Sequence, residues 1–364
     1  MRPEADLLEI ETRLRKLAPA SDRQDGTLDE EIALLTHLGW LRACMPIRWG
    51  GDGWGSEPVG ALDAFNVLRA LGRANLSVAR LFEGHMNAVK LVALYGDDPE
   101  QRKVAEVVEA GALLGVWGAD DPHEPVRYEN RGERLSLSGK KRFASGLGLV
   151  RKAIVTVATE DGPQMLLVPT DDPDRFDHSA WAMDAMRATQ SGRYDFDGIE
   201  LDSSALLGAP GDYHREPHFE GGVWRYCAAH LGAAEALYSE MLEHLVQNNR
   251  ADDIDQQRRI FAAGTAIETA RLWLVRAAGE VEAAGAKPEK AALSLMAREV
   301  TEDACRRVAE TIERAMGIPA HIGGSFTDRM LRDLRLFLCQ AAPDAKRNRA
   351  ASTLIGRRAR PEHL

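Results

Sequence analysis

The sequence is poor in cysteine and lacks the spacing patterns of common metal and nucleotide sites. Its four cysteines, Cys44, Cys227, Cys305 and Cys339, lie far apart and form no C-x-x-C pair. This excludes a zinc-finger pattern and a dense disulfide framework. No G-x-G-x-x-G opens a helix after a strand, and no G-x-x-x-x-G-K-S/T is present. Histidine and acidic residues never gather at a spacing such as H-E-x-x-H, so we expect no metal.

Long uncharged segments are missing as well. The longest, residues 315–327, has thirteen residues, whereas a helix that spans a bilayer needs about 18 to 20. The first six residues, MRPEAD, carry acids and no apolar run of the kind found in secretory signals. We therefore expect no membrane partner and a cytoplasmic location.

Positive charge is in deficit. The chain has 46 Lys and Arg residues against 56 Asp and Glu residues, which gives a net charge of −10. Such a chain repels a phosphate backbone, so we expect no nucleic-acid partner. The basic residues between 346 and 358 indicate a solvated carboxy-terminal face.

What is present is typical of a folded chain with two or three packing units. Of its 364 residues, 45% are apolar and 28% are charged. Helical spacing runs through about the first 110 residues, short apolar runs with turn signals fill residues 111–208, and helical spacing returns from about residue 224. Helices followed by strands and then by helices predict an α+β fold with segregated layers.

The last part of the strand-rich segment shows a shift in its alternation. Apolar residues alternate at Tyr194 and Phe196, and then at Ile199 and Leu201 beyond Gly198. A change of register by one residue predicts a β-bulge at the glycine.

Several segments resemble motifs of the acyl-CoA dehydrogenase family, in the order and spacing found there. Residues 38–55 (LGWLRACMPIRWGGDGWG) are similar to its Gly, Pro, Gly-Gly-x-Gly turn, and residues 137–146 (LSGKKRFASG) to a strand that touches the cofactor. Residues 181–192 (WAMDAMRATQSG) resemble the strand that closes its central domain. Residues 94–102 (LYGDDPEQR) and 331–335 (LRDLR) extend the match over nearly the whole chain.

The resemblance implies a three-part fold that binds a flavin. Members of the family have a helical domain, a small β-barrel and a four-helix bundle, with FAD between the barrel and the bundle. We accordingly expect a helical domain at residues 1–110, a β-barrel domain at 111–210 and a helical bundle at 211–364. Wide apolar arcs on the bundle helices, together with the family's cofactor contacts across subunits, predict a homodimer or homotetramer.

The resemblance also names candidate cofactor residues. Phe143 takes the place of the family's aromatic flavin wall, Ser145 that of a hydroxyl donor, and Trp117, Gly118 and Asp120 that of the strand beside the ring. An aromatic wall and a few polar donors suit a planar ring with hydrogen-bonding edges. The alternative is that the aromatic residues are ordinary core residues. The family's Gly-Ser-Asp loop is replaced here by a shorter connection at residues 123–127.

Arg250 is the candidate ligand for the cofactor's pyrophosphate. It ends the helix expected at residues 224–249, where the family has an arginine that reaches the cofactor of a neighbouring subunit. A guanidinium group matches two phosphate oxygens. The usual Phe-Gly after it is replaced by Ala-Asp-Asp at residues 251–253, which weakens a phosphate site, and the alternative is a surface arginine.

The catalytic base of the family is not found at either of its usual places. Nine residues beyond the arginine of the Arg-Asp motif stands Ala341, which accepts no proton. The second place falls near Gly222, with Glu220 the nearest acid on a different helical face. Asp344 is close in sequence, but it follows Pro343, which predicts a turn and an exposed or capping aspartate.

His85 is the remaining candidate for proton transfer. Imidazole titrates near neutrality, and this position resembles a histidine of flavin monooxygenases built on the same fold. The alternative is a helix histidine bonded to the backbone. His230 and His321 are weaker candidates, and the latter lies in a glycine-rich segment that either packs on the cofactor or connects helices.

The leading interpretation is an FAD-dependent oxidoreductase of the acyl-CoA dehydrogenase type, acting on an acyl-CoA or a related small molecule. Two alternatives stay open. The first is a monooxygenase on the same fold that receives reduced flavin from a separate reductase, with His85 assisting. The second is a flavin-binding protein without catalysis.

Overall fold

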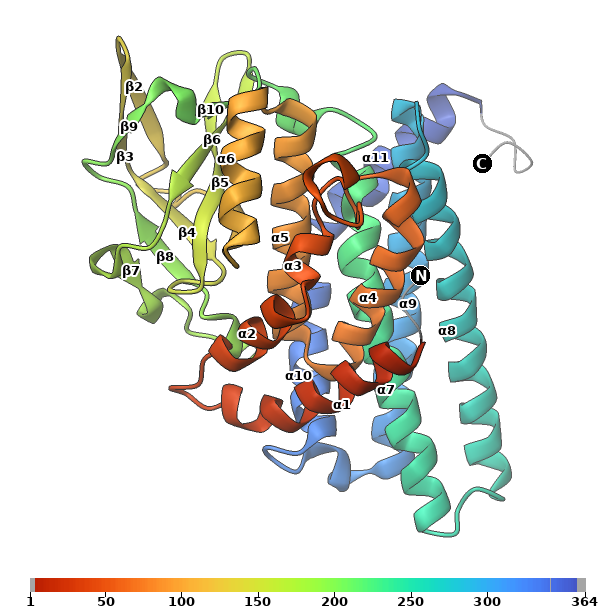
Figure 1. Ribbon diagram of the computed structural model, residues 1–364. Helices are drawn as coiled ribbons and strands as arrows, with labels where there is room; N and C mark the ends of the chain where they lie inside the picture. Colours follow the sequence, from red (N-terminus) through yellow and green to blue (C-terminus); the bar gives the residue numbers. More distant parts are fainter. Residues whose placement is uncertain (1–3, 341, 359–364) are drawn as a thin grey trace.

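The computed structural model describes residues 4–340 and 342–358, and its elements follow the order helices, strands, helices (Figure 1). This confirms the expected α+β class. The first helices are α1 (Glu4–Ser21), α2 (Asp29–His37), α3 (Trp40–Ala43), α4 (Ala61–Ala74), α5 (Leu76–Tyr95) and α6 (Asp98–Glu109). The last are α7 (Trp224–Gln247), α8 (Ile254–Val281), α9 (Ala291–Met316), α10 (Phe326–Leu338) and α11 (Pro343–Gly356).

The strands between them form three small sheets. One sheet has the order β1-β5-β6-β10, the second β2-β3-β9 and the third β4-β8-β7. The strands are β1 (Leu113–Trp117), β2 (Arg127–Arg131), β3 (Arg134–Ser138), β4 (Lys140–Ala144), β5 (Val150–Thr159), β6 (Gly162–Pro169), β7 (Phe176–Asp177), β8 (Gly192–Asp195), β9 (Glu200–Asp202) and β10 (Leu206–Leu207). Within the described residues they do not close into the expected barrel, because no ladder joins the three sheets edge to edge.

The predicted bulge at Gly198 is a turn between two sheets. β8 pairs with β4 and β7, whereas β9 pairs with β3. Gly198 lies between them with a φ of +74°, a conformation that glycine adopts without steric cost. The shift in alternation therefore marks the point where the chain leaves one sheet for another.

Local sequence explains where the helices of the first part begin. The Asn75 side chain accepts a hydrogen bond from the backbone N–H of Ser77 at the start of α5. Asp97 and Glu100 form a capping box at the start of α6. The helix α5 lies against β1, so it connects the helical part with the first sheet.

The long helices α7, α8 and α9 pack on one another, and α10 packs on α7 (Figure 1). A fifth helix, α11, follows and lies against α9. Pro343 is one of its first residues, where a missing N–H costs nothing, so the proline opens a helix instead of the turn that we expected.

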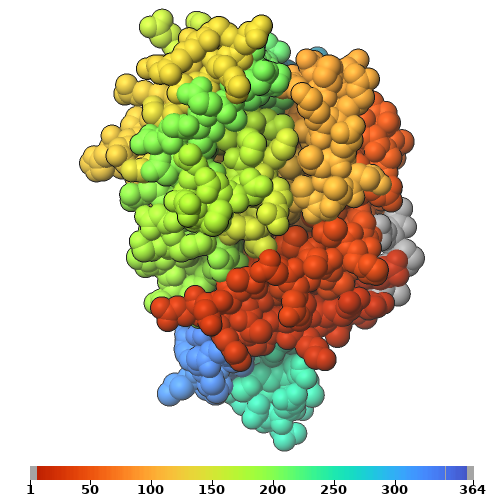
Figure 2. Space-filling model, turned by 60° about the vertical axis from the view of Figure 1, so that its left-hand side comes forward, coloured from red at the N-terminus to blue at the C-terminus, as the bar shows by residue number. Residues whose placement is uncertain are grey.

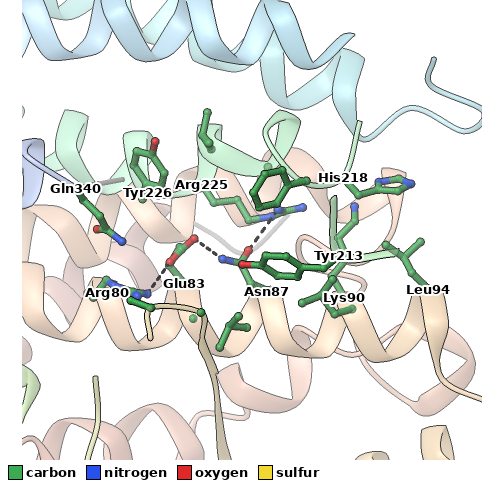
Figure 3. Close-up of a pocket in the computed structure, with 18 of the residues that line it drawn as sticks. Arg80, Glu83, Asn87, Lys90, Leu94, Tyr213, His218, Arg225, Tyr226 and Gln340 are labelled. Carbon is green, nitrogen blue, oxygen red and sulfur yellow. Dashed lines mark hydrogen bonds and ion pairs between the residues drawn. The ribbon is translucent and has the colours of Figure 1, made fainter. Parts of the chain in front are cut away.

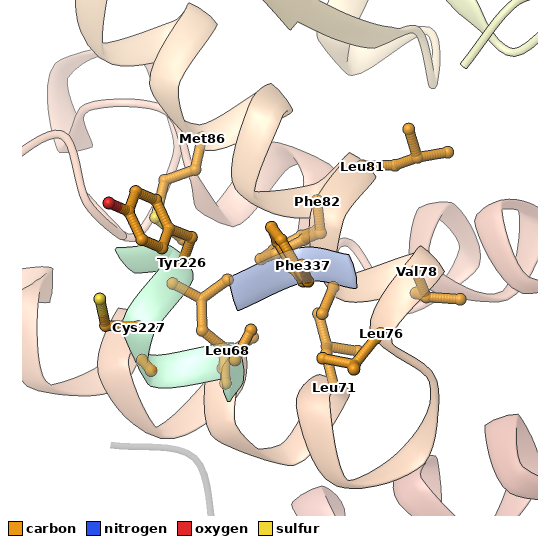
Figure 4. Close-up of a cluster of buried hydrophobic side chains, with 14 of the residues drawn as sticks. Leu68, Leu71, Leu76, Val78, Leu81, Phe82, Met86, Tyr226, Cys227 and Phe337 are labelled. Carbon is orange, nitrogen blue, oxygen red and sulfur yellow. The ribbon is translucent and has the colours of Figure 1, made fainter. Parts of the chain in front are cut away.

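Four helices from distant parts of the sequence share one apolar core (Figure 4). Leu68 of α4, Phe82 of α5, Cys227 of α7 and Phe337 of α10 are all buried within it. Because α4 and α5 share this cluster with α7 and α10, the first helices and the last helices form one packed body.

The contact between α4 and α7 brings two backbones together. A Cβ atom added to Gly72 would lie 2.1 Å from the carbonyl oxygen of Ala229, and one added to Gly232 would lie 2.1 Å from that of Arg69. Real side chains do not approach backbone this closely, so both positions require glycine.

A buried cluster of charges ties the strand region to α1 and α10. Asp22 accepts hydrogen bonds from Arg187 at 3.1 Å and from Arg332 at 2.6 Å. Asp333 accepts from the backbone N–H of Met186 at 2.7 Å, and burial raises the pKa of this carboxyl to about 6. Figure 2 shows the first helices and the strand region meeting along this face.

Among the described residues, none of the helices combines the length and the apolar character needed to cross a bilayer. The same residues contain no group of three or more His, Cys, Asp or Glu side chains placed to hold a metal ion.

Adding one methyl group to Gly72 or Gly232 should destabilise the fold. We expect Gly72→Ala and Gly232→Ala each to lower the free energy of unfolding by about 1–3 kcal/mol, because α4 and α7 must move apart. The matched control is Gly279→Ala on α8, where an added Cβ meets nothing within 4 Å. That change should stabilise the protein by about 0.5–1 kcal/mol. Chemical denaturation followed by circular dichroism measures all three, and equal effects would contradict the assigned contact.

Candidate functional site

A cavity of about 400 Å³ lies between α5, the end of β1 and the start of α7, and is called the central pocket here. Figure 3 shows α5 along one wall with its polar side chains turned toward α7. The lining residues are Arg80, Glu83, Gly84, Asn87, Lys90, Leu91, Leu94, Val116, Gly118, Ala119, Tyr213, His218, Phe219, Gly222, Val223, Arg225, Tyr226, Gln340 and Lys346.

A chain of hydrogen bonds runs along the α5 wall. Glu83 accepts from Arg80 at 3.0 Å through one carboxylate oxygen and from Asn87 through the other. Asn87 in turn accepts from Arg225 of α7 at 3.3 Å. Both oxygens of Glu83, which is the single carboxylate among the described residues of this lining, are therefore engaged.

Glu282, at the end of α8, ends this series of hydrogen bonds. Its carboxylate accepts from Lys90 of α5, from Arg225 at 2.5 Å and from the indole N–H of Trp224 at 3.1 Å. Burial alone would raise the pKa of Glu282, but the charges of Arg225 and Lys90 outweigh it and lower that pKa. Burial lowers the pKa of Lys90, although Glu282 opposes this shift.

One histidine and two tyrosines of the wall are neutral near pH 7. Burial, with smaller contributions from Lys90 and Arg225, lowers the pKa of His218 to about 4. Burial raises the pKa of Tyr213 to about 12 and that of Tyr226 well above its usual range. The pocket therefore combines neutral aromatic groups with cations.

Of the sequence-predicted cofactor residues, Gly118 lines the central pocket. Trp117 is buried next to it, packs on Tyr194 with ring centroids 5.3 Å apart, and donates its indole N–H to the carbonyl oxygen of Ser145 at 3.0 Å. Trp117 therefore supports the strand from behind instead of facing the cavity.

Phe143 and Ser145 lie together at a kinked strand edge. Phe143 has a φ of +56°, which is strained for a non-glycine residue, and its side chain is 47% exposed. Its ring stands nearly perpendicular to that of Trp181, with centroids 6.1 Å apart. The hydroxyl of Ser145 accepts a hydrogen bond from that of Ser191 at 3.0 Å.

Trp181 and Ser191 line a second cavity of about 770 Å³, called the edge pocket here. It lies between residues 24–27 of the first helical part and residues 178–191. Phe143 and Ser145 thus each contact a residue that lines this cavity.

Asp120 has a partner within the protein. Its carboxylate accepts from Lys141 Nζ at 2.7 Å and from the backbone N–H of Val126 at 3.0 Å. Lys141 is completely buried, and burial lowers its pKa despite the hydrogen bond from its ammonium group to Asp120. The carboxylate serves as the counter-ion of this lysine.

Arg250 lies apart from the other candidates. It follows α7, whose 24 residues place its two ends roughly 35 Å apart, and the central pocket is at the opposite end. Its guanidinium donates to the carbonyl oxygen of Ala315 at 3.0 Å. Within one chain the structure does not bring Arg250 to either pocket.

His85 is buried between two backbone groups. Its Nε2 lies 3.0 Å from the carbonyl oxygen of Leu41, and its Nδ1 accepts from the N–H of Leu114 at 3.0 Å. Burial lowers its pKa to about 4. The side chain is fully buried, and it is not part of the lining of either pocket. A catalytic role for His85 stays a prediction.

The two weaker candidates, His230 and His321, also lie outside both pockets. Burial lowers the pKa of His230 to about 3, and its ring packs on Phe337 with centroids 4.4 Å apart. His321 is exposed and lies 3.6 Å from Glu313.

The two sequence positions at which the family carries its catalytic base lie at or next to residues of the central pocket. Ala341 lies outside the described residues, but its neighbour Gln340 lines the pocket, and so does Gly222. Glu220 is buried and bound by Arg349 at 2.7 Å. Asp344 is 89% exposed and pairs with a neighbouring arginine.

Sequence reasoning missed the polar wall of the pocket. Arg80, Glu83, Asn87 and Lys90 recur at spacings of three and four along α5, a helix that is otherwise largely buried. A polar stripe at helical spacing within an apolar segment was the available signal.

No family model matches the chain. Three characterised or named proteins are similar in sequence. A dibenzothiophene monooxygenase of Rhodococcus erythropolis is 26% identical over 208 residues, 54% of this chain, which spans only 49% of that protein. The 3-sulfinopropanoyl-CoA desulfinase of Paraburkholderia xenovorans (strain LB400) is 25% identical over 94% of this chain and 92% of its own. The probable FMNH2-dependent monooxygenase SfnC of Pseudomonas putida is 24% identical over 77% of this chain and 73% of its own.

Solved structures cover nearly the whole chain. The complex of TdsC from Paenibacillus sp. A11-2 with FMN and indole superposes with a TM-score of 0.83, at 18% identity, over 98% of both chains. The glutaryl-coenzyme A dehydrogenase complex with glutaryl-CoA has a TM-score of 0.81 at 18% identity, over 98% of this chain and 96% of its own. The chain has the acyl-CoA dehydrogenase fold. The resemblance stated from the sequence is thereby confirmed for the fold.

Replacing His85 by glutamine should change how stability depends on pH. Neutral His85 is favoured in the folded state, so the unfolded chain binds more protons below pH 6.5 and stability falls as the pH drops toward 4. The His85→Gln variant keeps a hydrogen-bond donor and an acceptor. Between pH 6.5 and 4 its free energy of unfolding should fall by up to roughly 3 kcal/mol less than that of the unchanged protein. His218 and His230, whose pKa values are also lowered, preserve part of the slope.

Denaturant titrations at pH 4 to 7 measure this difference, with the exposed His321→Gln as the matched control. A fall in kcat without a change in the pH profile of stability would instead support the catalytic role suggested by the sequence.

Proposed function

We propose that this protein is a flavin-dependent monooxygenase that uses reduced FMN to oxidise a small molecule in the central pocket. The observation that carries the proposal is the lack of an unengaged carboxylate among the described residues of the lining. Glu83 is bonded on both oxygens, and Gly222 and Gln340 stand at or beside the places of the family's base. Removal of an α proton from a thioester needs such a base, whereas oxygen insertion does not.

The residues present fit a flavin ring. Gly118 exposes a strand edge without a side chain at the mouth of the central pocket, and a Cβ added there would have only ordinary contacts at 3.7 Å. Phe143 offers an exposed aromatic face, and Ser145 offers a hydroxyl group. An exposed phenylalanine held in a strained conformation is costly unless something packs on it.

A bound reduced flavin would supply the two electrons and, together with solvent, the two protons with which O2 gives one oxygen atom to the substrate and one molecule of water. In this arrangement Phe143 and Ser145 would hold the ring, and Trp117 would support their strand from the core. Tyr213 and Phe219 also line the pocket, and their rings would help to exclude water. Asp120 is bound by Lys141, so it would keep the strand in place and make no contact of its own.

Support for FMN over FAD comes from two similar proteins. TdsC is described with FMN, and SfnC is named as FMNH2-dependent. The position of Arg250 adds no phosphate contact within one chain, because its guanidinium donates to Ala315. FAD remains the alternative that the family resemblance suggests.

Reduced FMN would come from a separate flavin reductase, which is the protein partner that this proposal requires. We also propose a homodimer or homotetramer. The outer side of α8 supports this, because Ile254, Phe261 and Leu272 expose 61%, 77% and 56% of their surface.

A second candidate is the dehydrogenation or related conversion of an acyl-CoA. The observation that favours it is Glu83 itself, which is buried at the pocket wall and would have to exchange a hydrogen bond with Asn87 to accept a proton. The desulfinase, whose similarity extends over 94% of this chain, is named for a CoA thioester substrate.

Oxygen consumption separates the two candidates. With FMN, NADH and a flavin reductase, we expect the protein to couple oxygen uptake to oxidation of a small organosulfur or aromatic substrate, measured with an oxygen electrode and product analysis. We expect no bleaching of bound flavin by acyl-CoA thioesters without oxygen. Bleaching that disappears in Glu83→Gln would favour the second candidate and contradict the first.

Phe143 should matter for flavin affinity. We expect Phe143→Ala to weaken FMN binding about tenfold, because the aromatic contact is lost. Fluorescence titration of FMN measures the dissociation constant. Leu8→Ala, which removes an exposed apolar side chain from α1, away from both pockets and from the outer side of α8, should leave FMN affinity unchanged. Equal effects of both changes would place the flavin elsewhere.

A further inference from the structure

The buried charges at the back of the central pocket do not balance. Arg80 and Glu83 form one pair, 3.0 Å apart. Lys90 and Arg225 share a second carboxylate, that of Glu282. All three of these side chains are at most 5% exposed. Two cations against one anion leave an excess of one positive charge inside the protein.

No further carboxylate of the described wall offsets this charge, and Lys346, a buried lysine that also lines the pocket, brings no negative charge. His218, Tyr213 and Tyr226 are neutral near pH 7. Toward the α11 end, the buried Glu220 is bound by Arg349, so its charge is already matched. An uncompensated charge in a buried site is unfavourable unless a counter-ion enters.

Polar atoms of the same wall lack partners. Among the described residues, none bonds to Arg225 Nε or His218 Nδ1, although both atoms are buried. Buried polar atoms in folded proteins almost always have partners. Their residues line the pocket together, and Figure 3 shows Arg225 and His218 close to Lys90 at one end of it.

We propose that the substrate of the central pocket carries a singly charged oxyanion, a carboxylate, sulfinate or sulfonate, that lies against Lys90 and Arg225. This inference rests on the proposed function, because it names the substrate of the same site. Guanidinium and ammonium groups form their strongest hydrogen bonds with such anions. One negative charge matches the excess that Lys90 and Arg225 leave over Glu282.

The shape of the cavity is consistent with this orientation. Figure 3 shows Lys90 and Arg225 close together, and Gly118 and Ala119, at the strand edge beside the proposed flavin ring, line the same cavity. A cavity of about 400 Å³ takes a small molecule. With its anionic group held by the two cations, the rest of the molecule faces that edge.

Binding of matched ligand pairs tests the proposal without flavin or turnover. The probes are butanoate and propane-1-sulfonate against the neutral butanamide, titrated into the flavin-free protein by calorimetry. We expect the two anions to bind at least tenfold more tightly than the amide. Equal affinities for anion and amide would overturn the proposal whatever the variants show.

Two variants locate the binding site. Either Lys90→Gln or Arg225→Gln leaves one cation on Glu282, so both should fold and both should lose at least tenfold in affinity for the anions. The control is Arg306→Gln, which removes an arginine that is 54% exposed and paired with Glu302 on α9. If both variants fold, as judged by circular dichroism, and retain full anion affinity, the assignment to this wall is wrong.

FMN also carries an anionic group, so the titrations are repeated with saturating FMN. Simultaneous binding of propane-1-sulfonate and FMN is the expected result, and mutual exclusion would mean that the cations hold the cofactor's phosphate instead. The outcomes for the two proposals differ. Anion preference without oxygen uptake contradicts the monooxygenase proposal alone, and oxygen uptake without anion preference contradicts this inference alone.

Discussion

The carboxylate of Glu282 holds together the place where three helices meet. It lies at the end of α8, and its hydrogen bonds reach Lys90 on α5 and both Trp224 and Arg225 on α7. Without it, two buried cations would face each other with no anion between them. The geometry of the pocket wall, and therefore any chemistry in it, depends on this one side chain.

The fold class was predictable because it rests on local periodicity. Helical spacing before residue 110 and after 224 and short alternating runs between them required only neighbouring residues. The arrangement of the strands in three separate sheets instead of a barrel could not be predicted in this way, because pairing between distant strands is set by tertiary contacts. Gly198 illustrates this limit, since the same shift in alternation is expected for a bulge within one strand and for a turn between two.

The candidate site was predictable in part, and the reason differs from residue to residue. Gly118 and Phe143 could be proposed from a resemblance, because their positions along the backbone determine which groups they offer to a ligand: a strand edge without a side chain and an aromatic ring. Asp120 could not be judged, because its role depends on Lys141, a residue whose complete burial is visible only in three dimensions. Glu282 lies 192 residues from Lys90 in sequence, and no local pattern marks such a pair.

The backbone contact between α4 and α7 has a consequence for how a ligand reaches the pocket. Gly72 and Gly232 leave no space between these helices, and α5 shares their apolar core, so the walls formed by α5 and α7 cannot separate without breaking it. The third part of the pocket lining is not a helix of this core. Tyr213 and His218 belong to a connecting segment of short turns between the last strand and α7. Entry and exit of a ligand therefore depend on this segment. Its residues determine the width of the opening, whereas α5 and α7 determine the shape of the pocket.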